Sequence, residues 1–134
     1  MIKKLNINDR AALAIKNKTK KVEIRAGGKY DYSKLSADDI IEFNSNNLGI
    51  LYVKVKNVNY YKSLDELFML EGTRYTTSST NDKEEAIKNV EKISDYKNRI
   101  RENGVYAIHI KYLYSENTIW EELYNKSKNI RNNK

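Results

Sequence analysis

Alternating apolar and polar residues predict four strands in this chain. In the first of them, Val22 and Ile24 alternate with charged side chains, which is typical of a strand with one buried face. An Asn-rich turn separates the second strand from a long third strand, so these two are predicted to form a hairpin. The four strands are expected at residues 20–25, 40–43, 49–60 and 105–112.

Helical patterns lie between the strands and predict an α+β domain. Asn8 and Ser63 are suitable N-caps, and Glu66 stands three residues after Ser63, as in a capping box. The polar segment 29–36 is expected to form a loop, and the segment 73–80, which lacks apolar periodicity, is expected to form an exposed loop. Helices are expected at residues 10–15, 63–68, 81–93, 94–101 and 116–128.

The composition narrows the class of protein. Hydrophobic residues make up 40% of the 134 residues and charged residues 32%, which is too apolar for a disordered chain and too charged for a membrane protein. No apolar run approaches the roughly 20 residues of a spanning helix, and we expect a cytoplasmic protein without membrane association. Since the chain has no cysteine and one histidine, no metal or other cofactor is expected.

Charge is distributed unevenly along the chain. The net charge of +7 divides into +7 for residues 1–29, −4 for residues 30–124 and +4 for residues 125–134. Such asymmetry favours a polyanionic partner, although a basic tail that is merely solvated is the alternative. The eleven tyrosines would supply rings that stack on bases if this partner is a nucleic acid.

The strand at residues 20–25 carries the candidate chemistry. Lys21, Glu23 and Arg25 are expected to share one face, with Lys20 at the start of the opposite face, near the mouth of a pocket. The alternative is an exposed charged strand with no role beyond cross-strand pairing. His109, the only histidine, lies in a predicted strand and is expected to have a structural role.

The spacing of Lys20, Glu23 and Arg25 resembles the G-x-K-x-x-E-x-R signature of the ASCH domain family, with Lys18 where that family usually has glycine. The resemblance extends over roughly residues 6–114. It implies a PUA-like small β-barrel flanked by helices in residues 1–114, followed by a C-terminal helical extension with a basic tail in residues 115–134.

The same resemblance implies binding of RNA or a modified nucleoside. The fold is expected to bring Glu71 to Lys20, Glu23 and Arg25 in one pocket. The residues predicted to bind RNA or substrate are Lys18, Lys20, Lys21, Arg25, Lys29, Tyr30, Arg74 and Tyr75.

A hydrolase is the alternative function, either an acetylcytidine amidohydrolase or a ribonuclease. Some bacterial ASCH proteins remove the acetyl group of acetylcytidine with a lysine, a threonine and a glutamate. By position Lys20 and Glu71 resemble the lysine and the glutamate, but Glu23 stands at the threonine position. A carboxylate there would disfavour a developing oxyanion. A third alternative is a protein-interaction module that docks through the C-terminal helix.

Overall fold

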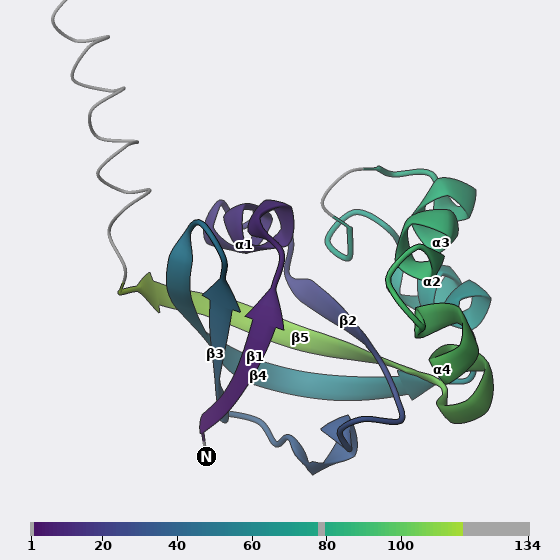
Figure 1. Cartoon of the computed structure of the whole chain (residues 1–134), viewed down its shortest axis with the longest axis horizontal. Coiled ribbons are helices and arrows are strands. Elements are labelled where there is room, and N and C mark those ends of the chain that lie inside the picture. Colours follow the sequence, from purple (N-terminus) through teal and green to yellow (C-terminus); the bar gives the residue numbers. More distant parts are fainter. Residues whose placement is uncertain (1, 78–79, 117–134) are drawn as a thin grey trace, which may run out of the picture.

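The described part of the chain consists of a curled five-stranded sheet and four α-helices, arranged as in Figure 1. The computed structural model describes residues 2–77 and 80–116. The strands are β1 (Ile2–Ile7), β2 (Val22–Ala26), β3 (Ile40–Ser45), β4 (Gly49–Tyr61) and β5 (Val105–Ser115). The helices are α1 (Asp9–Lys16), α2 (Leu64–Glu71), α3 (Lys83–Glu91) and α4 (Tyr96–Asn103), with a 3₁₀ turn at Tyr32–Lys34. These elements confirm the α+β class.

The strand order β1-β3-β4-β5-β2 leaves β1 and β2 as the two edges of the sheet. β1 pairs with β3 in parallel, and the other neighbours are antiparallel. The sheet curls into a half-barrel, so its two edges approach each other (Figure 1). Arg25 of β2 bridges them, because its guanidinium donates a hydrogen bond of 2.7 Å to the carbonyl oxygen of Asn6 in β1.

The two faces of the sheet have separate hydrophobic cores. The concave face packs against α1 and includes the fully buried Ile41, Phe43 and Ile108. The convex face packs against α2, α3 and α4, with Leu67 and Val105 at its centre. Since side chains alternate along a strand, neighbouring residues of β2 belong to different faces.

The predicted strands and helices within the described residues are all present, and their caps follow the sequence. The Asn8 side chain accepts a hydrogen bond from the Ala11 amide, and Ser63 Oγ accepts one from the Glu66 amide. The expected helix at 116–128, and with it the C-terminal extension beyond residue 116, lies outside the described residues.

The strand β1 was not predicted from the sequence. Leu5 and Ile7 alternate with Asn6 and give the period of a strand, but the segment is short and flanked by charged residues. The segment becomes a strand because its backbone pairs with β3. In the described part of the chain, no helix is both long enough and apolar enough to cross a membrane.

Lys18 adopts a left-handed conformation with φ of 64°. It lies between α1 and β2, where the chain turns sharply, and a side chain in this region of φ costs conformational energy that glycine avoids. The turn therefore explains why glycine is the expected residue at this position of the signature.

Candidate functional site

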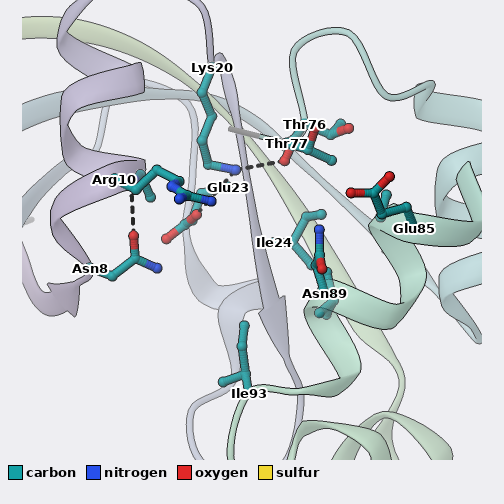
Figure 2. Close-up of a pocket in the computed structure, with 13 residues that line it drawn as sticks. Asn8, Arg10, Lys20, Glu23, Ile24, Thr76, Thr77, Glu85, Asn89 and Ile93 are labelled. Carbon is teal, nitrogen blue, oxygen red and sulfur yellow. Dashed lines mark hydrogen bonds and ion pairs between the residues drawn. The ribbon is translucent and has the colours of Figure 1, made fainter. Parts of the chain in front are cut away.

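A cavity of about 520 Å³ lies between α1, β2, the loop that follows α2, and α3 (Figure 2). Its walls are mainly polar. The side chains that matter for its chemistry come from all four segments and are Arg10, Lys20, Glu23, Thr76, Thr77 and Asn89. In Figure 2 the Lys20 ammonium lies between the loop that carries Thr76 and the Glu23 carboxylate.

Lys20 is buried, with 6% of its surface exposed. Its ammonium donates hydrogen bonds to the carbonyl oxygens of Val22 (2.8 Å) and Thr76 (2.7 Å), and it lies 3.5 Å from Oε1 of Glu23. Burial lowers the pKa of Lys20, while the neighbouring Glu23 opposes this change. An ammonium has three N–H donors, so these contacts engage all of them.

Glu23 is the counter-ion of the buried Lys20 and the half-buried Arg25. Its Oε2 accepts hydrogen bonds from Nε (3.1 Å) and Nη2 (2.7 Å) of Arg25, and only 8% of its side chain is exposed. Burial raises the pKa of Glu23, but the charges and hydrogen bonds of Arg25 and Lys20 outweigh it and leave the pKa below its ordinary value. Glu23 is therefore ionised at neutral pH, and this buried charge network fixes the side chains at the cavity floor.

The expectation that Lys20 and Glu23 point away from each other is wrong. Strict alternation applies from Val22 onward, where Glu23 lies opposite Ile108 on the concave face and Val22 lies opposite His109 on the convex face. Lys20 precedes β2, so its backbone is free of that pattern and its side chain turns back toward Glu23.

The expectation that Glu71 joins this pocket is also wrong. Glu71 ends α2 on the convex face, where its Oε1 lies 2.7 Å from Nε2 of His109 and its Oε2 accepts hydrogen bonds from Asn59 (2.9 Å) and Tyr61. It does not line the cavity of Lys20 and Glu23. The sheet separates the two groups, because His109 and Glu23 belong to opposite faces. His109 thus has the structural contact expected of it.

Comparison with known proteins comes from structure, because no protein-family model matches the sequence and no curated protein matches it significantly. The hypothetical protein PH0355 is 29% identical, with a TM-score of 0.72 over 84% of this chain and 100% of that chain. The Pyrococcus furiosus protein PF0455 is 27% identical, with a TM-score of 0.64 over 84% and 98%. A variant of ZmASCH from Zymomonas mobilis is 12% identical, with a TM-score of 0.56 over 87% and 75%. The chain has an ASCH-like fold.

Within this ASCH-like fold, Lys18 and Lys21 lie outside the cavity of Lys20 and Glu23. They line a separate hollow of about 350 Å³, together with Lys56 and Lys111. Lys20 contributes to both hollows. The segment that carries the signature therefore has a cationic hollow on one side and the polar cavity on the other.

The remaining predicted binding residues fall into two places. Arg74 and Tyr75 are exposed near Lys21, whose ammonium lies 4.7 Å from the centroid of the Tyr75 ring. Lys29 and Tyr30 line a cavity of about 510 Å³ at the other end of the gap between β1 and β2. Neither pair contacts the cavity of Lys20 and Glu23 directly.

Sequence reasoning missed several residues that line the cavity. Arg10 was part of a predicted helix, Thr76 and Thr77 were part of a predicted exposed loop, and Asn89 was part of another predicted helix. Hydrogen bonds from the Lys21 and Val22 amides to the Tyr75 carbonyl bring the loop with Thr76 and Thr77 to the start of β2. Arg10 and Asn89 reach the same cavity from α1 and α3, through the tertiary fold. Among residues 2–77 and 80–116, no group of three His, Cys, Asp or Glu side chains is arranged to hold a metal ion.

Proposed function

We propose that this protein binds RNA or a modified nucleoside, with one base in the cavity of Lys20 and Glu23. The observation that carries the proposal is the buried Lys20–Glu23–Arg25 network at the cavity floor. A network of this kind holds a carboxylate in a fixed position beside a polar cavity, and ligand sites combine such a cavity with a few fixed polar groups.

The free acceptor capacity of Glu23 suggests what the cavity recognises. Arg25 occupies Oε2, while Oε1 lies 3.5 Å from the Lys20 ammonium and retains room for another donor. Carboxylates accept hydrogen bonds from exocyclic amino groups of bases, such as N4 of cytosine. Arg10, Thr77 and Asn89 add polar groups around the same space. We therefore favour a nucleoside whose base carries an exocyclic amino or acylamino N–H over uridine, whose base has only the ring N3–H.

The geometry supports a binding role more than a hydrolytic one. A lysine acts as a base or nucleophile when it loses its proton and has a free lone pair. Burial lowers the pKa of Lys20, but its ammonium donates to two carbonyl oxygens and lies beside the Glu23 carboxylate, and these contacts all use its N–H groups. Glu71, which by position resembles the glutamate of the alternative hydrolase, contacts His109 instead.

The test is a thermal-shift screen of nucleosides, including acetylcytidine, cytidine, adenosine, guanosine and uridine, with chromatography of each mixture. A ligand at 100 times its Kd should stabilise the protein by about 2.7 kcal/mol. We expect a shift without product, and we expect Arg10→Ala to weaken it. Arg101→Ala is the matched control, because Arg101 is exposed on α4 and lines no part of the cavity.

Three results distinguish the alternatives. Product that disappears in Lys20→Ala would replace the proposal with the hydrolase. A shift that Arg10→Ala leaves unchanged would place the ligand elsewhere. Absence of any shift, together with no binding of RNA at low ionic strength, would overturn the proposal, because electrostatic binding to RNA is strongest at low salt.

A further inference from the structure

The hollow of about 350 Å³ beside the α1–β2 connection differs in composition from the cavity of Lys20 and Glu23. We call it the lysine hollow. The Lys20 ammonium is held by the carbonyl oxygens of Val22 and Thr76, so the exposed cations at the hollow belong to its four other lysines. The residues that line it are Ile15, Lys18, Lys20, Lys21, Lys56, Ile110, Lys111 and Tyr112.

The four exposed lysines have no negative side chain beside them in the described part of the chain. No Asp or Glu of these residues lines the hollow, and none lies within ion-pair distance of the four ammonium groups. Lys111 also lies directly opposite Lys54 of β4, and like charges in that position destabilise a sheet. Since a hollow lined by charge of one sign concentrates counter-ions, an anion would be attracted here.

Two irregularities of the backbone place lysines at the hollow. Lys18 has a φ of 64°, which costs energy for a residue with a Cβ, and it stands where the signature usually has glycine. Lys56 lies in a β-bulge, because Val55 and Asn57 pair with successive residues of β5 and leave Lys56 without a paired residue. Bulges redirect side chains and are frequent beside functional sites, where strained residues also cluster. Both features favour a binding role for these lysines over simple solvation.

The rest of the hollow is mainly apolar. Ile15 of α1 and Ile110 of β5 belong to the concave core, and Tyr112 packs against that core. The volume lies near the lower end of the range of about 300–1,000 Å³ for ligand sites. A hydrated inorganic ion gains little from apolar walls, whereas an apolar group is stabilised when it leaves water to pack on them. The hollow therefore suits a small ligand that combines an apolar body with negative charge.

We infer that the lysine hollow is a second ligand site, which binds a small organic anion with an apolar body and at least two negative charges. The apolar body packs on Ile15, Ile110 and Tyr112, and the negative groups contact Lys18 and Lys56. A phosphate monoester and a dicarboxylate share this chemistry, since both present charged oxygen acceptors to ammonium groups. The inference goes beyond the proposed function and does not rest on it, because the nucleoside occupies the cavity of Glu23.

Isothermal titration calorimetry with four probes separates the effect of charge from that of the apolar body. Phenyl phosphate and isophthalate carry both features, inorganic phosphate carries only the charge, and benzyl alcohol carries only the ring. We expect phenyl phosphate or isophthalate to bind at least about tenfold more tightly than the other two probes. The tighter of the two identifies the head group. Amide NMR shifts caused by that probe should cluster at Ile15, Ile110 and Tyr112.

Lys18→Gly/Lys56→Gln removes the two lysines that the backbone irregularities place at the hollow. Glycine relieves the strain at residue 18, so this variant is expected to fold. Lys62→Gln/Lys88→Gln is the matched control, because it removes the same charge from two exposed lysines that do not line the hollow. We expect the first variant to weaken binding of the tighter probe by about tenfold, since each exposed ion pair contributes about threefold, and the control to change it by less than about twofold.

Three results would overturn the inference. Phenyl phosphate and isophthalate that bind no more tightly than inorganic phosphate or benzyl alcohol would show that the hollow does not recognise the combination of charge and apolar body. Equal weakening in the two double variants would mean that only the net charge of the protein attracts the anion. Shifts that cluster at Arg10 and Asn89 would place the anion in the cavity of Lys20 and Glu23. The proposed function stands in the first two cases, since the screen of uncharged nucleosides tests it separately.

Discussion

Among the described residues, Glu23 is the only carboxylate that contacts both Lys20 and Arg25, and replacing it by glutamine removes that carboxylate. Glutamine keeps the shape of the side chain, but it carries no charge, so the buried Lys20 and the half-buried Arg25 lose their counter-ion. Arg25 would keep its hydrogen bond to the Asn6 carbonyl, and Lys20 would keep its bonds to two carbonyl oxygens. The change therefore tests the charge of Glu23 more than the packing around it.

The expected cost is large for a single isosteric change. Removal of one partner from a buried ion pair destabilises a protein by about 3–5 kcal/mol, because it leaves the remaining charge uncompensated. Glu23 and Lys20 are each only 6% exposed, so solvent screens them little. We therefore expect Glu23→Gln to lower the free energy of unfolding by about 3–5 kcal/mol, a large part of the roughly 5–15 kcal/mol typical of a domain.

Urea denaturation followed by far-ultraviolet circular dichroism measures this loss. With a slope of about 2 kcal/mol per molar urea, the midpoint should fall by roughly 1.5–2.5 M. Glu102→Gln is the matched control, because Glu102 is exposed on α4, and its cost should stay within about 0.5 kcal/mol. Adding Lys20→Met to Glu23→Gln should cost less than the two single changes together, by about 1–3 kcal/mol, since it removes one unpaired cation.

Two results would refute this reasoning. A midpoint for Glu23→Gln that matches the Glu102→Gln control would mean that Glu23 does not neutralise the buried cations. Simple additivity in the Glu23→Gln and Lys20→Met pair would mean that the two groups do not interact electrostatically.

Three further predictions concern stability, each measured by urea denaturation. Burial raises the pKa of Glu71, but hydrogen bonds from Tyr61, Asn59 and His109 and the charge of His109 outweigh this effect and leave the pKa below 4.5. The stability that ionised Glu71 contributes is therefore fully present above pH 4.5, and it is lost as the pH falls through the lower pKa of the folded protein. Glu71→Gln should therefore cost about 1–3 kcal/mol at pH 7 and much less at pH 2; an equal cost at both would contradict this. Lys18→Gly should be more stable than Lys18→Ala by about 1 kcal/mol, because residue 18 has a φ of 64°, which strains any residue with a Cβ. Equal stability of the two variants would mean that the backbone is not strained at residue 18. Gly27→Ala should cost about 1–3 kcal/mol, because a Cβ would lie 2.7 Å from the Asn103 carbonyl oxygen; an unchanged midpoint would mean that the backbone relaxes.

The candidate site could be predicted only where its residues are close in sequence. Glu23 and Arg25 share a face because they are two residues apart in one strand, and their ion pair follows from that spacing. The helix beginning at Asn8 and the β3–β4 hairpin are likewise local, since caps and turns act over a few residues. The ASCH-like fold was predicted for the same reason, as its signature occupies one short segment.

Only the tertiary structure decided which distant groups meet. Glu71 is in the expected helix, yet the sheet lies between it and Glu23, and no local pattern states which face of a sheet a helix covers. The loop at Thr76 reaches Lys20 across 56 residues of sequence, and β1 becomes an edge strand by pairing with β3. The sequence determined the elements and the charge of the candidate site, because these depend on neighbours along the chain. The cavity and its polar walls depend on contacts between distant segments, which form only when the sheet curls.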